Sequence, residues 1–557
     1  MTFQRWLKSV RVLAAVLSVL LLCESGVANA ETFYVTAGGD DMAPGTQARP
    51  WRSIQRAVNM AIAGDTVVVG GGTYQERVAF ARSGQPDKKI SFKNADRQTP
   101  IIDGQGLAMA KWDALVTFNN VGYVDFEGFE VRNSSAFNIW VGGESHHLRL
   151  TRLNVHHGGS SGIWLEGPKS RPAMSIIRAN KVHDHPLGGI TLWGAPGGYY
   201  RIEDNEVWGN LGIGNYDGIQ IGGGDGASHH VVVKNNVVHD NGSANNGEDP
   251  IDLGGHAINH HYLVEGNLIY GGTGSFKLHS GDLKSGWYAP GVSSYHIARF
   301  NRLIGKAFVI YQYPDPIAVY NNTLVNCGQC VMFYEATHPN QSLGDDSFAG
   351  GDAGRMVWKN NLFFQDVPST EYALLQGGGN GPTIDLSYRS VRFQNNMYKF
   401  APGQRLSWYA VFGPGIHEAT FQAYKSSNPT SPPDVGSMLT GVSLRQMFTE
   451  DYHLAPGSPA IDKGVALTKA VNAGDKSNKL IVDRASFFQD GYCVDGECLN
   501  TPDSIVVGSN PPVAIAAVND ATNTITLAAP MSWRAGATVT LPYTGSAPDI
   551  GAFERAP

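Results

Sequence analysis

Five ionisable residues stand beside short apolar stretches in the middle of the chain. The segments NYDGIQIG, GEDPIDLGG and GSFKLHSG contain Asp217, Glu248, Asp249, Asp252 and Lys277. Carboxylate oxygens are the ligands that Ca²⁺ prefers, and a lysine held beside a bound metal can act as a general base. Taken singly, however, each acid is more typical of a turn cap. The chemistry therefore depends on whether the fold brings these side chains together.

The three segments are copies of a longer repeat. Each copy has an asparagine, an apolar strand, a polar turn, and then an apolar-x-apolar triplet followed by glycine. The marker asparagines are Asn154, Asn180, Asn205, Asn236, Asn267, Asn301 and Asn322, with weaker copies at Asn361 and Asn396. Strands that recur at the spacing of these asparagines, without an intervening helix, predict a parallel β-solenoid. A β-propeller is the alternative, but its repeats are longer and contain paired antiparallel hairpins.

Aligning the triplets places the candidate residues in columns along the solenoid. Strand alternation turns the middle residue of each triplet to solvent, with neighbours about 4.8 Å apart. This exterior column is predicted to contain Trp164, Thr191, Gln220, Asp252 and Lys277. Two positions before the triplets, Asp217 falls over Asp249, with Glu248 beside it. Carboxylates this close repel one another unless a cation binds them, and oxygen-only ligands favour Ca²⁺ over zinc or copper.

In that order, the three segments resemble the signature segments of polysaccharide lyase family 9. The resemblance implies a right-handed parallel β-helix with a Ca²⁺ site and a catalytic lysine. It assigns Asp217, Glu248, Asp249 and Asp252 as metal ligands and Lys277 as the base, and it extends over roughly residues 32–401. The chain departs from the family pattern at Glu248, where aspartate is usual, and at Pro250, which replaces a glycine.

The implied activity is that of a polysaccharide lyase, a carbon–oxygen lyase that cleaves an acidic, uronate-containing polysaccharide by β-elimination. On the same fold, the alternatives are a glycoside hydrolase, a uronate epimerase and a non-catalytic polysaccharide-binding solenoid. Several aromatic and histidine side chains that follow the site are candidates for holding sugar. These are His256, His279, Trp287, Tyr288, Tyr311 and Tyr313.

The chain is predicted to have three parts. Residues 1–30 resemble a signal peptide, because basic residues precede an apolar run over 12–22 that is too short to span a bilayer, and a small-x-small site follows. Residues 31–400 form the catalytic β-helix, with a helix at about 53–63 that covers its open end. Residues 401–557 contain β-helix end segments and a β-rich insertion. We therefore expect a secreted or periplasmic protein.

The net charge limits the classes of partner that we expect for this chain. The net charge is −7, and removing a leader with three basic residues and one acidic residue leaves −9. This charge argues against nucleic acid as a partner. The expected partner is an acidic polysaccharide, with no membrane contact after leader cleavage, and we expect a monomer.

In an oxidising compartment, CGQC (residues 327–330) and CVDGEC (493–498) predict two local disulfides. Free thiols and a redox motif in CGQC are the alternatives.

Overall fold

The computed structural model describes residues 30–555, except for eleven gaps. These gaps are residues 215, 223–227, 244–247, 255–258, 280–294, 312–315, 335–355, 369–372, 378–390, 403 and 409–433. The predicted signal peptide lies outside the described residues except for Ala30.

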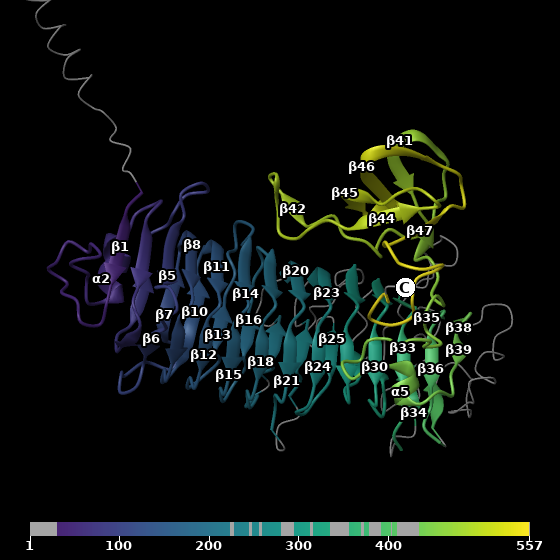
Figure 1. Cartoon of the computed structure of the whole chain (residues 1–557), viewed down its shortest axis with the longest axis horizontal. Helices are drawn as coiled ribbons and strands as arrows, with labels where there is room; N and C mark the ends of the chain where they lie inside the picture. The colour runs from purple at the N-terminus through teal and green to yellow at the C-terminus, as the bar shows by residue number, and fades with distance from the viewer. Residues whose placement is uncertain are drawn as a thin grey trace, which may run out of the picture.

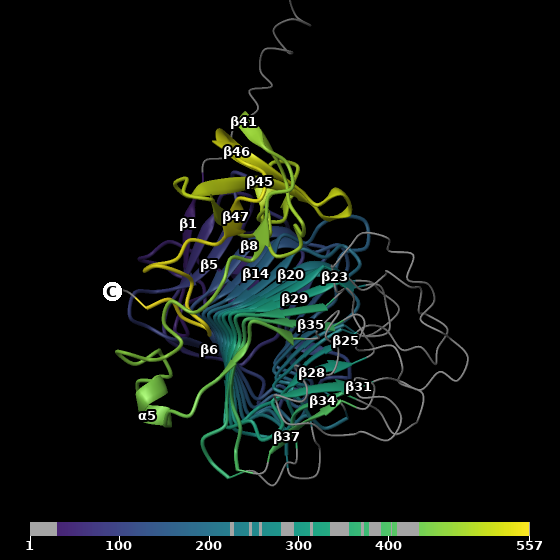
Figure 2. The ribbon, with the colours of Figure 1, turned by 90° about the vertical axis from the view of Figure 1, so that its right-hand side faces the viewer.

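The chain winds into a right-handed parallel β-helix with three long sheets, as the sequence predicted (Figures 1 and 2). One sheet runs from β1 (Thr32–Val35) to β38 (Asp434–Val435), and another from β3 (Gly72–Tyr74) to β39 (Met438–Leu439). Within each sheet, a strand pairs in parallel with its counterpart in the next coil. This parallel pairing is incompatible with the propeller alternative.

The third sheet contains Asp252 and Lys277, the other predicted site residues directly precede its strands, and it is called the site sheet below. In spatial order, its strands are β4 (Val78–Phe80), β7 (Ala114–Asn119), β10 (Phe137–Gly142), β13 (Ile163–Leu165), β16 (Ile190–Leu192), β19 (Ile219–Ile221), β22 (Ile251–Leu253), β25 (Phe276–His279), β28 (Phe308–Tyr311), β31 (Val331–Tyr334), β34 (Ala373–Gly377) and β37 (Arg405–Trp408). The outer two residues of each aligned triplet from β13 to β25 are buried in the core.

The predicted exterior column is confirmed in register. Gln220 pairs with Asp252, and Asp252 pairs with Lys277. The prediction that the whole column faces solvent is wrong, because Trp164 and Thr191 are buried. Alternation fixes the direction of a side chain but not what covers it. Other aromatic side chains pack against Trp164, and Thr191 lies between Trp164 and Gln220, both of which have longer side chains.

The predicted N-terminal helix is present and shorter than expected. Helix α2 (Ile54–Met60) begins after the N-cap Ser53 and is followed by β2 (Thr66–Val69). It lies at the N-terminal end of the β-helix (Figure 1) and buries Ile54, Ala57 and Val58. Among the helices of the described residues, none is long and apolar enough to cross a membrane.

A ladder of buried asparagines runs through one turn of successive coils. From Asn205 onward, the Oδ1 atom of each asparagine accepts hydrogen bonds from the backbone N–H and the Nδ2 of the asparagine one coil earlier. The members are Asn180, Asn205, Asn236, Asn267, Asn301, Asn322, Asn361 and Asn396. Asn154, a marker asparagine of the predicted repeat, does not belong to this ladder. Asn154 lies one residue out of register, and the backbone N–H of Leu153 makes the ladder bond to Asn180.

The C-terminal part adds a six-stranded antiparallel sheet. Its strands are β40 (Thr468–Lys469), β41 (Gly474–Ile481), β44 (Ser504–Val507), β45 (Val513–Asn519), β46 (Thr524–Trp533) and β47 (Thr538–Thr540). It packs against the outer side of the sheet that contains β20 (Ser228–Lys234) and β23 (Asn259–Glu265). The site sheet lies on another side of the β-helix and is not covered by this module (Figure 2).

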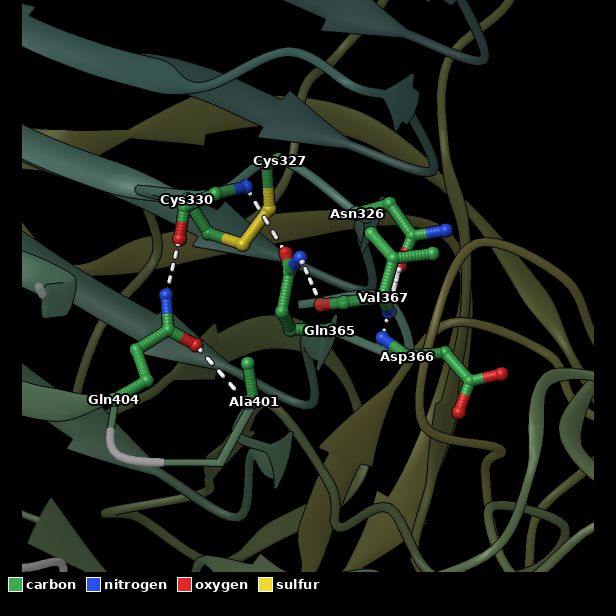
Figure 3. Close-up of a disulfide and its surroundings, with 9 residues drawn as sticks. Asn326, Cys327, Cys330, Gln365, Asp366, Val367, Ala401 and Gln404 are labelled. Atoms are coloured by element: carbon green, nitrogen blue, oxygen red, sulfur yellow. Dashed lines mark hydrogen bonds between the residues drawn. A yellow bond between two sulfur atoms is a disulfide. The ribbon is translucent and has the colours of Figure 1, made fainter. Parts of the chain in front are cut away.

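Both predicted local disulfides are formed, between Cys327 and Cys330 and between Cys493 and Cys498. The first closes the turn between β30 (Thr323–Val325) and β31. Within this turn, the backbone N–H of Gly328 donates a hydrogen bond of 2.9 Å to Oε1 of Gln365, in the next coil (Figure 3). The disulfide therefore belongs to a turn that is already tied to its neighbour.

Candidate active site

Three of the predicted acids and the predicted lysine come together on the site sheet. Carboxylate oxygens of Asp217, Asp249 and Asp252 lie within 4.8 Å of one another. The Lys277 Nζ lies 2.6 Å from Oδ2 of Asp249 and 3.5 Å from Oδ2 of Asp252. These four residues come from three consecutive coils, as the repeat alignment predicted.

Backbone hydrogen bonds from the next coil fix two of the carboxylates. The backbone N–H of Asp249 donates to Oδ1 of Asp217 at 2.9 Å, and that of Ser275 donates to Oδ1 of Asp249 at 2.7 Å. The coil that follows approaches closely at Gly274, which has φ of +65°; a Cβ there would lie 2.2 Å from the carbonyl oxygen of Glu248. Only glycine fits this position.

A second lysine supports the turn that leads into the Lys277 strand. The buried Lys306 donates from Nζ to the backbone carbonyls of Gly272, Thr273 and Gly274 at 2.8, 2.9 and 3.2 Å. Burial lowers the pKa of this ammonium. Lys306 stands two residues before Phe308 of β28, the repeat position that Asp217 and Asp249 occupy in their own coils. Sequence reasoning missed Lys306, although that spacing could have revealed it.

The site concentrates negative charge in a poorly solvated place. Asp217 is 3% and Asp249 is 6% exposed. Burial raises the pKa of Asp217 well above its ordinary value, and the neighbouring charges of Asp252 and Asp249 raise it further. Burial also raises the pKa of Asp249, against the opposing effect of Lys277. Burial by itself would lower the pKa of Lys277, but the charges of Asp252 and Asp249 outweigh it and raise that pKa.

The donor set of the cluster fits a hard divalent cation. Asp217, Asp249 and Asp252 offer only carboxylate oxygens, and their mutual repulsion would be relieved by a bound Ca²⁺. Glu248, the predicted fourth ligand, is not part of this group of three. Its side chain lies against Gly212, where a Cβ would come within 2.3 Å of the Glu248 Cγ.

The sequence-based candidates for holding sugar cannot be placed. His256, Trp287, Tyr288 and Tyr313 lie outside the described residues, as do the side chains of His279 and Tyr311. Sequence reasoning also missed an aromatic cluster on the N-terminal side of the site, formed around Trp140, Trp164, Trp193 and Tyr216. The signal was available in FNIWVG, where Trp140 occupies the middle of a triplet one coil before Trp164.

Comparison with known proteins identifies the β-helix. Residues 33–186 match a model of the Pel9A-like, right-handed β-helix region, and residues 114–284, which include all five predicted site residues, match a right-handed β-helix region. The protein YwoF of Bacillus subtilis (strain 168) is 30% identical over 125 residues, which are 21% of this chain and 27% of YwoF. The chain thus spans about a quarter of the length of that relative.

One further relative and one solved structure are pectate lyases by name. Pectate lyase PEL9 of Emericella nidulans is 24% identical over 297 residues, covering 40% of this chain and 69% of PEL9. The crystal structure of pectate lyase Pel9A covers 95% of this chain and 98% of its own, with 14% identity and a TM-score of 0.46. From the matched regions and the architecture of its sheets, the chain is a right-handed parallel β-helix protein, of which residues 33–186 match the Pel9A-like β-helix region.

Proposed function

We propose that the chain is a secreted or periplasmic, Ca²⁺-dependent lyase that cleaves an acidic, uronate-containing polysaccharide by β-elimination. The observation that carries this proposal is the contact of 2.6 Å between Lys277 Nζ and Asp249, beside two further carboxylates on the same face. The likeness to a relative named pectate lyase supports the same class of reaction.

In the proposed reaction, Lys277 as a neutral amine removes the proton from C5 of a uronate residue. The electron pair of the C5–H bond forms a C4–C5 double bond, and the C4–O glycosidic bond breaks. The departing oxygen takes a proton from water, so one chain ends in an unsaturated uronate and the other in a new hydroxyl. The lysine is then an ammonium and loses its proton to solvent.

Asp217, Asp249 and Asp252 would hold the Ca²⁺ ion, which supplies neutralisation of the substrate carboxylate and of the charge that develops on it. The carboxylates also control the lysine. Without a cation, Asp249 and Asp252 stabilise the ammonium form of Lys277, which cannot accept a proton. Once they are neutralised, this stabilisation is lost. The cluster thereby couples cation binding to the basicity of Lys277.

The test is ultraviolet absorbance during incubation with a panel of acidic polysaccharides, with Ca²⁺ and with chelator. We expect absorbance from unsaturated ends with wild type and Ca²⁺, and a loss of at least about a thousandfold in Lys277→Ala, since the base is removed. Asp252→Asn should lose activity that excess Ca²⁺ partly restores. Lys181→Ala is the matched control, because Lys181 is an exposed strand lysine on another sheet.

Each remaining outcome identifies a competing function. Product that forms equally well with chelator would keep the lyase and reject the Ca²⁺ site. New reducing ends without absorbance would indicate a hydrolase, and altered uronate stereochemistry without cleavage would indicate an epimerase. Binding to a polysaccharide with no product from any member of the panel would leave a binding solenoid and contradict the proposed reaction.

A further inference from the structure

The site sheet has an aromatic outer surface on the N-terminal side of the candidate site. Trp140 belongs to β10 and Trp164 to β13, Trp193 follows β16, and Tyr216 precedes β19. The ring of Trp164 lies 5.6 Å from that of Trp193 and 5.9 Å from that of Tyr216. Trp164 is 4% exposed, whereas Trp140, Trp193 and Tyr216 are half-buried at the edge of the cluster. These four residues are called the aromatic platform below.

The platform is in line with the catalytic groups. Trp140 and Trp164 pair in register, and the same column continues through Thr191 to Asp252 and Lys277. At about 4.8 Å per strand, Trp164 lies four strands, or roughly 19 Å, from Lys277. Figure 1 shows β10, β13 and β16 on the N-terminal side of β25 along the β-helix. Tyr216 directly precedes Asp217, so the platform reaches the carboxylate cluster.

Aromatic rings extend from the platform toward the N-terminus. Trp164 contacts Phe137, with ring centroids 5.0 Å apart, and Phe137 lies 6.0 Å from Trp112. Trp112 is 61% exposed, and the Nζ of Lys111 lies 5.0 Å from its ring centroid. The row thus ends in an exposed ring with a cation above it. A cation at this position suits a polymer that carries carboxylates.

A pyranose ring is the ligand that suits this surface. A sugar has an apolar C–H face that stacks on an aromatic ring and polar edges that stay hydrated, and aromatic side chains recur where one side of a contact is apolar and the other is wet. The indole Nε1–H of Trp164 is already satisfied by Oε1 of Glu166 at 3.0 Å. The indole of Trp164 therefore needs no further polar partner. What the platform still offers are the faces and edges of half-buried rings beside the site.

We infer that the aromatic platform is a stacking subsite for pyranose rings of the acidic polysaccharide, remote from the bond that is cleaved. This inference rests on the proposed function and deepens it, because it lays the sugar chain along the column from Trp140 toward Lys277. Oligosaccharides long enough to reach both the platform and the lysine bind more tightly than short ones. The platform contributes to binding and not to proton transfer.

The test measures binding in chelator, where elimination is suppressed. Tryptophan fluorescence of the full chain is titrated with tri- and hexasaccharides of galacturonate, guluronate, mannuronate and glucuronate. We expect at least one hexasaccharide to change the fluorescence, and Trp193→Ala to weaken its binding about tenfold while Trp193→Phe restores most of it. Trp208→Ala is the matched control, because Trp208 is also a half-buried stacked tryptophan, but on β18 (Glu206–Trp208) of another sheet.

Activity separates this inference from the proposed reaction. Where a lyase product forms, Trp193→Ala should raise KM for the hexasaccharide and leave kcat within about twofold. Unchanged binding and KM in a folded Trp193→Ala protein would overturn the platform even if the lyase reaction is confirmed. Conversely, Trp193-dependent binding without any product would keep the platform and reject the reaction. If wild type binds no member of the panel, the platform is overturned.

Discussion

Asp217 and Asp249 use the same carboxylates for architecture and for the candidate chemistry. One oxygen of each accepts a backbone N–H from the following coil, and oxygens of both belong to the cluster that faces Lys277. The turn-cap interpretation and the metal-ligand interpretation of these acids are thus compatible. Because the backbone bonds hold the carboxylates in place, the cluster does not need a bound cation to be assembled.

Lys306 is the residue whose role is most open to a simple test. In Lys306→Met, three backbone carbonyls before β25 lose their ammonium partner, and we expect a loss of about 1–3 kcal/mol in the free energy of unfolding. The same change should loosen the turn that holds Gly274 beside Asp249 and lower kcat more than it raises KM. Urea unfolding and steady-state kinetics measure both effects.

The control for this prediction is Lys181→Met, since Lys181 is 62% exposed and touches none of these carbonyls. Lys306 serves to position the turn and does not contact the reacting atoms. Retained stability together with reduced turnover would still support positioning, whereas unchanged values of both would show that the three hydrogen bonds do not matter.

Among the elements, the asparagine ladder holds the coils in register. Asn236 is fully buried; its Oδ1 accepts from the backbone N–H and Nδ2 of Asn205, and its Nδ2 donates to the carbonyl of Ile202. Asn236→Ala leaves these groups unsatisfied and should lower the free energy of unfolding by about 2–4 kcal/mol. Asn154→Ala, outside the ladder, should cost less than about 1 kcal/mol. Equal losses in chemical denaturation would contradict the ladder's role.

The strands of the β-helix were predictable because one local rule repeats. Apolar-x-apolar triplets specify which residues face the core, and stacking the triplets was enough to bring Asp217, Asp249 and Asp252 to Lys277. The pattern of marker asparagines is less exact, because Asn154 lies one residue out of register with the ladder. The triplet rule says nothing about neighbours that cover an exterior position, so it called Trp164 solvent-facing and missed the aromatic platform.

The antiparallel C-terminal sheet was predictable only as β-rich, because contacts distant in sequence determine where it docks. Arg299, from the β-helix, forms a bidentate pair with Asp503 at 2.7 and 2.8 Å and also contacts Glu265. Neither the pairing nor the sheet against which the module packs follows from a period of about 30 residues. The whole molecule therefore has a repeated part, which its sequence pattern encodes, and an appended part, which it does not.

Imidazole rings line the junction between these two parts. His230 stacks on His261 with ring centroids 4.8 Å apart, and Nε2 of His261 lies 3.2 Å from Asp520 of the C-terminal module. Burial lowers the pKa of His230 to about 2, helped by the nearby His261, and burial likewise lowers that of His260 to about 3. At neutral pH, both imidazoles are accommodated uncharged in the folded protein.

Acid should therefore weaken this junction as the pH falls below the ordinary pKa of histidine. The folded-state pKa values of His230 and His260 lie below the unfolded value of 6.5, so below pH 6.5 the unfolded chain binds more protons and stability falls as the pH is lowered. At pH 5, the two histidines together should cost roughly 4 kcal/mol. Urea unfolding at pH 7, 6 and 5 measures this loss. His260→Phe keeps a stacking ring without a titrating nitrogen and should reduce the loss of stability between pH 7 and pH 5 by about 2 kcal/mol. A wild-type stability that is flat from pH 7 to 5 would mean that the junction admits protonated imidazole, by opening to water or by a closer approach of Asp520.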